Sequence, residues 1–224
     1  MRFRNREEAG RILANKLSQY RNDPTALILA LPRGGVTVGY QLSLALHVPL
    51  DVFMTRKIGA PGNPEYAIGA VVETGSHYLN QEAVGSFGLT RHELDRLIHV
   101  QEEEIARRKD LYRQGRPLPE LMGRTVLLVD DGIATGSTFM ASALAIHSLQ
   151  PRRLVGVLPV GPPSTIREVR SHVDELVILV TPEPFEAVGN FFADFTQVED
   201  RDVIQHLNLA KEAMLKRTPS SPAS

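Results

Sequence analysis

The sequence predicts an α/β fold in which helices flank a doubly wound, mostly parallel sheet. Short apolar runs that suit fully buried strands recur along the chain, as in residues 26–31 and 126–129. Segments with apolar residues at helical spacing alternate with these runs. Strands that alternate with helices build a parallel sheet with helices on both faces.

Length and composition limit the number of domains and the classes of function that the chain can have. We expect one domain over residues 1–216 of the 224, with a small hood near residues 181–197, followed by a disordered Pro- and Ser-rich tail, residues 217–224. The net charge of −1 argues against nucleic-acid binding, and the lack of cysteine excludes disulfides and thiolate chemistry. Neither a signal core nor a membrane-length apolar run is present, so we expect a cytoplasmic protein without membrane contact.

The first third of the chain reads as helix, strand, helix and strand. Asn5 caps the first helix, with Glu8 three residues on as its capping-box partner. Residues 26–31 form a strand that a short Gly loop joins to a helix over residues 36–46. Residues 50–55 form a further strand, and residues 58–66, with two Gly and two Pro, are expected to be an irregular lid.

The remaining elements follow the same logic. Residues 67–73 and 77–79 predict a hairpin, and a Thr90–Glu93 capping box opens a long, highly charged helix to about residue 114. Its apolar stripe could be covered by a second copy in a homodimer. The remaining strands are expected at residues 126–129, 154–160 and 175–180, and the remaining helices end near residues 149, 170 and 216.

The candidate ligand-binding residues come directly after the strand of residues 126–129. Asp130 and Asp131, here called the acid pair, follow it, and then comes the phosphate bend, Ala134, Thr135, Gly136, Ser137 and Thr138. The carboxyl end of a parallel strand is where α/β sheets bind ligands, and N–H groups at a helix start suit a phosphate. The carboxylates suit a sugar diol or a metal.

Three interpretations of this stretch remain open from local chemistry. It is a strand-ending turn with an N-cap, the magnesium-binding strand of a P-loop nucleotidase, or a cradle for ribose 5-phosphate. The second needs a Gly-Lys-Ser or Gly-Lys-Thr motif, which this chain lacks.

Residues 126–138 resemble the phosphoribosyl pyrophosphate signature of type I phosphoribosyltransferases: four apolar residues, two acids, a spacer, an apolar residue, then x-Thr-Gly-x-Thr. The resemblance implies that the phosphate bend holds the 5-phosphate and the acid pair holds the ribose hydroxyls and Mg²⁺. Residues 31–35, LPRGG, resemble the pyrophosphate loop of the same family. The family resemblance also implies that pyrophosphate contacts Arg33, Gly34, Gly35, Arg56 and Lys57.

The hood segment, residues 181–197, is similar to the base-binding segment of hypoxanthine-guanine phosphoribosyltransferases, which implies that Phe185 stacks on a base. Glu65, the only charge in the lid, positions a substrate amine or hydroxyl or is simply exposed. Two departures from the family stand out. No Lys or Arg occurs between Lys57 and Arg91, and the family's purine-reading lysine is absent.

The resemblance implies an enzyme that transfers the 5-phosphoribosyl group from phosphoribosyl pyrophosphate to a nitrogenous base and releases pyrophosphate. The two departures keep an alternative open, a regulatory protein that senses phosphoribosyl pyrophosphate or a nucleotide without chemistry. A weaker third option is a hydrolase of nucleotides or sugar phosphates that uses the same cradle.

Overall fold

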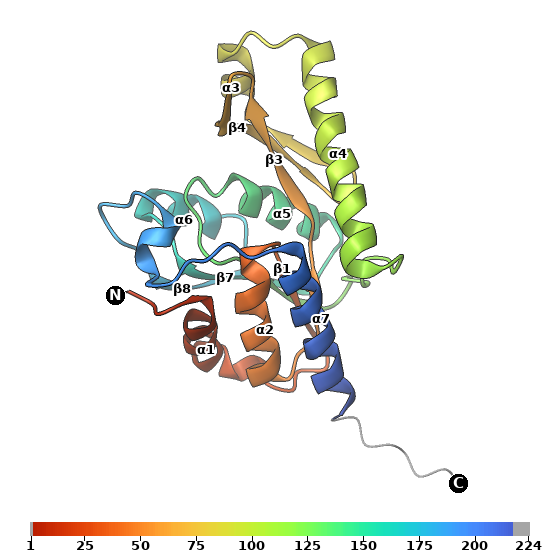
Figure 1. The fold of residues 1–224 in the computed structure, drawn as a ribbon, viewed down its shortest axis with the longest axis vertical. Coiled ribbons are helices and arrows are strands. Elements are labelled where there is room, and N and C mark those ends of the chain that lie inside the picture. Colours follow the sequence, from red (N-terminus) through yellow and green to blue (C-terminus); the bar gives the residue numbers. More distant parts are fainter. Residues whose placement is uncertain (1, 217–224) are drawn as a thin grey trace.

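The computed structural model describes residues 2–216, apart from the side chains of residues 64 and 65, and confirms the α/β architecture (Figure 1). The central sheet has five parallel strands in the order β2-β1-β6-β7-β8. In that order they are Leu50–Val52, Ala26–Ala30, Thr125–Val129, Arg153–Val160 and Glu175–Val180. A second, antiparallel sheet has the order β3-β4-β5, formed by Thr55–Ala60, Asn63–Val72 and His77–Leu79.

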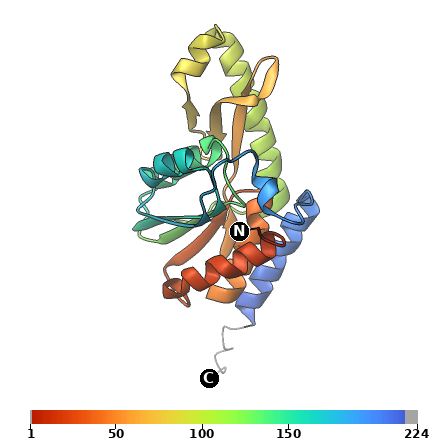
Figure 2. The same cartoon turned by 90° about the vertical axis from the view of Figure 1, so that its left-hand side faces the viewer.

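Helices cover both faces of the central sheet. On one face lie α1 (Arg6–Lys16), α2 (Gly34–Leu46) and α7 (Asp200–Leu215), and on the other α5 (Ser137–Ser148) and α6 (Pro163–Arg170) (Figures 1 and 2). The short α3 (Gln81–Ser86) and the long α4 (Arg91–Arg113) accompany the second sheet, which projects beyond the first (Figure 1). Two 3₁₀ turns, Ser18–Tyr20 and Val188–Phe191, complete the elements.

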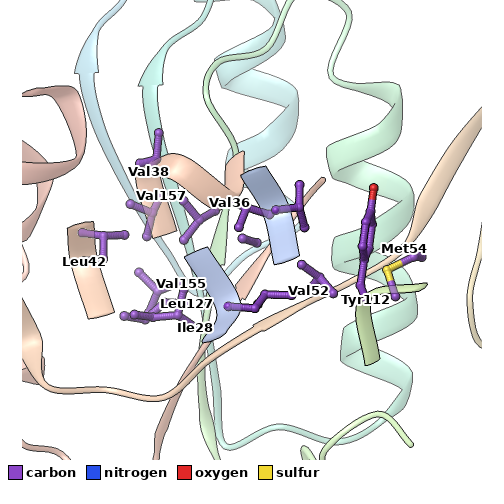
Figure 3. Packing of buried hydrophobic residues seen from close by; sticks show 14 of the residues in the cluster. Ile28, Val36, Val38, Leu42, Val52, Met54, Tyr112, Leu127, Val155 and Val157 are labelled. Carbon is purple, nitrogen blue, oxygen red and sulfur yellow. The ribbon is translucent and has the colours of Figure 1, made fainter. Parts of the chain in front are cut away.

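The main core lies between the central sheet and the helices of one face. Ile28, Leu127 and Val155 of the strands pack with Val36 and Leu42 of α2 (Figure 3). All five are fully buried, as the continuous apolar runs of these strands predict. The core continues through Val52 and Met54 to Tyr112, and so joins α4 to the rest (Figure 3).

The helix starts follow the predicted caps. The Asn5 side chain accepts a hydrogen bond from the Glu8 N–H, and Thr90 and Glu93 form a complete capping box. The Glu8 carboxylate departs from the expected box because it accepts from the Arg4 N–H instead of the Asn5 N–H.

The prediction of one strand over residues 50–55 was wrong. Strand β2 ends at Val52, and the chain then crosses to β3 in the second sheet, so Arg56 and Lys57 lie within an antiparallel strand. A buried ionic network makes the crossing feasible, because Arg113 donates to the Val52 carbonyl and the Met54 N–H donates to Glu73. These partners satisfy backbone groups that a continuing strand would have paired.

The expectation of an irregular segment over residues 58–66 was also wrong. Strands β3 and β4 form a hairpin, and its turn is made by Pro61 and by Gly62, which has a φ of +74°. Gly59 lies at a register shift between the strands. Three of the residues that suggested irregularity therefore occupy the turn and the bulge, the two places where a hairpin accommodates them.

Arg113 fastens the second sheet and α4 to the central sheet. Its side chain is 1% exposed, and its guanidinium donates to Asp51 (3.0 Å) and to both oxygens of Glu73. The charges are paired inside the junction, which such deep burial requires.

The hood segment is joined to the beginning of the chain. Phe3 forms a parallel bridge with Phe192, its N–H donates to the Phe191 carbonyl, and its carbonyl accepts from the Ala193 N–H. The predicted tail, residues 217–224, lies outside the described residues. None of the helices within residues 2–216 is long and apolar enough to cross a membrane.

Candidate functional site

The candidate site lies at the carboxyl edge of the central sheet, where β1 and β6 end side by side. Ala30 is in register with Val129, and the Leu31 N–H donates to the Val129 carbonyl (2.8 Å). The loop that carries Arg33 therefore leaves the sheet beside the acid pair. Sequence segments about one hundred residues apart thus meet at the position where parallel sheets bind ligands.

Gly34 and Gly35 are in direct contact with the acid pair. A Cβ added at Gly34 would lie 1.9 Å from Oδ2 of Asp131, and one at Gly35 would lie 2.8 Å from the Val129 carbonyl and 3.0 Å from Cα of Asp130. The family resemblance assigns these two glycines to a pyrophosphate contact. The structure adds a further reason for glycine, since any side chain at Gly34 would collide with the carboxylate beside it.

The two carboxylates of the acid pair have different surroundings. Burial, followed by the charge of Asp131, raises the pKa of Asp130 well above its usual range. The Asp131 N–H, which donates to Oδ1 of Asp130 (2.8 Å), opposes this shift. Asp131 has a cation as its partner, which sequence reasoning did not identify.

That cation is Arg6 of α1. Its Nε donates to Oδ2 of Asp131 (2.5 Å), its Nη1 donates to the Thr196 carbonyl (2.9 Å), and its Cζ lies 3.7 Å from the centre of the Phe195 ring. Arg6 thus connects the acid pair to the hood segment. No local motif pointed to this residue, because it is separated from Asp131 by 125 positions.

The phosphate bend leads into α5. Gly136 precedes the helix with a φ of +72°, and within the described residues no side chain caps the first turn of α5. Thr165 of α6 supports the bend because its hydroxyl donates to the Ala134 carbonyl (2.7 Å). The Ser137 hydroxyl donates to that of Thr135 (3.3 Å). Uncapped N–H groups and nearby hydroxyls are the donors that a phosphate requires.

The bend opens onto a cleft rather than being filled by side chains. A cavity of about 320 Å³ lies between the bend and the second sheet. Thr135 and Ser137 line it from one side, and Tyr66, Tyr78 and Asn80 from the other. The cleft therefore leaves room for an anion at the start of α5.

The predicted basic residues lie on two different elements. Arg33 directly precedes α2, has a side chain that is 31% exposed and forms an ion pair with Asp200 (3.8 Å). Arg56 and Lys57 are both half-buried in β3, and Nε of Arg56 donates to Gln101 of α4 (3.2 Å). The bases thus come from the loop before α2 and from the second sheet.

Two residues, Phe185 and Glu65, were expected to contact the base. Phe185 is half-buried and stacks on Phe191, with ring centres 5.4 Å apart and planes inclined by 15°. One face of the Phe185 ring is therefore already covered within the hood segment. The Glu65 side chain lies outside the described part of the chain.

Known proteins match this chain over most of its length. The family model of the phosphoribosyl transferase domain matches residues 4–189. Two proteins of Mycobacterium tuberculosis (strains CDC 1551 and H37Rv), provisionally named phosphoribosyl transferases, are each 38% identical to this chain over 208 residues, 93% of the chain and 47% of the relative. The chain thus spans about half the length of these curated relatives.

Among solved structures, the crystal structure of TT1426 from Thermus thermophilus superposes with a TM-score of 0.77. Its sequence is 39% identical, and the match covers 92% of this chain and 98% of that one. The chain therefore belongs to the phosphoribosyl transferase domain family.

Proposed function

We propose that this protein transfers the 5-phosphoribosyl group of phosphoribosyl pyrophosphate to a nitrogenous base and releases pyrophosphate. The observation that carries the proposal is the contact of Gly34 and Gly35 with the acid pair. This contact puts the loop proposed to bind pyrophosphate beside the carboxylates proposed to bind ribose. The two groups joined by the C1–O bond that breaks would then lie side by side.

The phosphate bend is the proposed anchor of the 5-phosphate. Helix α5 presents N–H groups at its start, Thr135 and Ser137 add hydroxyls, and the adjoining cleft of about 320 Å³ provides space. Asp130 and Asp131 would accept hydrogen bonds from the ribose hydroxyls. The pentose would thus be held at both ends.

In the proposed reaction a ring nitrogen attacks C1 of the ribose as the C1–O bond to pyrophosphate breaks. The electron pair of that bond leaves with pyrophosphate, and the ring nitrogen loses its proton. An oxocarbenium-like state develops on the sugar, so no protein nucleophile is required. The role of Arg33, Arg56 and Lys57 would be to stabilise the charge that grows on the leaving group.

The acid pair fits a magnesium ion shared with the substrate. Carboxylate oxygens are suitable ligands, and Mg²⁺ in such sites usually keeps waters and binds one or two carboxylates plus substrate oxygens. Within the described residues no group of three or more His, Cys, Asp and Glu side chains could hold a metal. Asp130 and Asp131 would therefore hold the ion together with the substrate. When bound, it would neutralise charge on the pyrophosphate.

The acceptor base would lie under the hood segment, with Phe185 stacked on it and Glu65 contacting an amine or hydroxyl. Phe185 has the aromatic surface for this role, although Phe191 already covers one of its faces. A pyrophosphate-release assay over a panel of purines and pyrimidines would identify the base.

The test of the proposal is the double variant Asp130→Asn with Asp131→Asn. We expect it to stay folded, because amides keep the shape of the carboxyl groups, and to lose pyrophosphate release with every base. Asp95→Asn on the exposed face of α4 is the matched control and should retain release. Unchanged turnover of the double variant would overturn the assignment.

A second candidate is a sensor that binds phosphoribosyl pyrophosphate without chemistry. The observation that favours it is the lack of any Lys or Arg between Lys57 and Arg91, a stretch that includes the β3–β4 hairpin turn. Calorimetry with phosphoribosyl pyrophosphate and Mg²⁺, followed by the release assay, separates the candidates. Binding without release for any base supports the sensor.

A further inference from the structure

Four arginines gather where α4 passes the starts of α2 and α7. We call this set, Arg33, Arg56, Arg107 and Arg108, the arginine cluster. Burial lowers the pKa of Arg56, and the charges of Arg108, Arg33 and Arg107 lower it further, against the opposing charge of Glu104. The Arg56 guanidinium therefore lies close enough to the other three to be repelled by their charges.

Two carboxylates neutralise only part of this charge. Glu104 accepts from Arg107 (2.8 Å) and Arg108 (2.6 Å). Asp200, at the start of α7, lies 3.4 Å from Arg107 and 3.8 Å from Arg33. These described ion pairs contain two carboxylates and three guanidinium groups, and Arg56 adds a fourth positive charge beside them, which leaves an excess of positive charge.

The position and chemistry of this excess fit a multiply charged anion. Arg33 directly precedes Gly34, which contacts the acid pair, so the cluster borders the proposed reaction site. Guanidinium groups bind phosphate oxygens in a bidentate manner. Arg108 is 13% exposed and Arg33 31%, so at least part of the cluster is shielded from water, where charge is felt more strongly.

We propose that Arg107 and Arg108 complete the pyrophosphate-binding half of the site, together with Arg33 and Arg56. The long helix α4 would then supply the positive charge that is missing from the stretch between Lys57 and Arg91. The ligand is the diphosphate group of the donor and of the released product. This inference rests on the proposed function, because it assigns residues to that same site.

Asp200 has a specific part in this arrangement. It holds Arg33 and Arg107 in the structure and also accepts from the Tyr112 hydroxyl (2.5 Å). A diphosphate that binds the arginines competes with this carboxylate. Removing the charge of Asp200 should therefore tighten diphosphate binding.

The test is calorimetric titration of the whole chain, in Mg²⁺, with inorganic pyrophosphate and separately with ribose 5-phosphate. We expect Arg107→Gln with Arg108→Gln to weaken pyrophosphate binding at least about tenfold, or about 1.4 kcal/mol. Binding of ribose 5-phosphate should stay within about twofold of wild type, because that ligand occupies the phosphate bend. The matched control, Arg91→Gln with Arg96→Gln, removes two exposed charges from the far end of α4 and should change neither affinity.

A second variant keeps the inference testable if the arginine variant fails to fold. Asp200→Asn retains the acceptor for Tyr112 and should tighten pyrophosphate binding about threefold. Unchanged or weaker binding in this variant, or wild-type affinity in the arginine variant, would overturn the inference and leave the proposed function standing. If wild-type protein binds neither ligand, both fail.

Discussion

The replacement Gly34→Ala tests the contact between the loop before α2 and the acid pair. The new Cβ would lie 1.9 Å from Oδ2 of Asp131, 2.5 Å from Cγ of the same residue and 3.0 Å from Nε of Arg6. Carbon and oxygen do not approach closer than about 3 Å without strong repulsion. The Asp131 carboxylate must therefore move by roughly 1 Å, which disturbs its contact with Arg6.

The expected effects on stability and activity differ in size. Overfilling a packed site costs about 1–3 kcal/mol of unfolding free energy, which a folded domain of this length can tolerate. A displacement of about 1 Å in a substrate-positioning group can reduce turnover by about 100-fold. We therefore expect Gly34→Ala to be folded, moderately destabilised and nearly inactive in pyrophosphate release.

Gly85→Ala in α3 is the matched control, since a Cβ there would meet no atom within 4 Å. In a helix this change should stabilise the fold by roughly 0.5–1 kcal/mol and leave turnover unchanged. Urea unfolding and the release assay measure both variants. Gly34→Ala with wild-type stability and turnover would refute the close contact on which the argument rests.

Two further predictions concern ion pairs. Arg6→Met should lower the urea unfolding free energy by about 2–4 kcal/mol, because it leaves the largely buried Asp131 carboxylate without its cation; wild-type stability would contradict this role. The hydrogen bond from Arg107, followed by that from Arg108, lowers the pKa of Glu104 to about 2 from 4.5, against the opposing effect of burial. The resulting stabilisation is present above pH 4.5 and is lost as the pH falls toward 2. Between these pH values, the unfolding free energy of Glu104→Gln should therefore fall by about 1 kcal/mol less than that of wild type, a figure that allows for solvent screening. An equal fall in unfolding free energy for wild type and Glu104→Gln over this pH range would contradict the prediction.

Local sequence patterns were sufficient for the parts of the site that lie next to each other in the chain. The apolar run before Asp130 and the phosphate bend that opens α5 are where residues 126–138 predicted them. Both depend on near neighbours, namely strand periodicity and helix-start chemistry, which a sequence displays directly.

Features that depend on distant partners were not predictable in this way. Residues 50–55 have the apolar character of one strand, yet the chain leaves the sheet after Val52 because Glu73 and Arg113 satisfy the crossing backbone. Arg6 is one of several charges near the start of the chain. Its contact with Asp131 follows from tertiary packing, which periodicity does not report.

The pairing of Phe3 with the hood segment affects the order in which contacts form while the chain is being synthesised. Hydrogen bonds from Arg2 to Phe192 and from Arg6 to Thr196 each span 190 residues. Contacts of such long sequence separation form late, since much of the chain must be ordered before they close. A ribosome must therefore release residues up to at least Thr196 before Arg6 can reach it, so this corner of the site assembles after the strands and helices that lie between the two residues.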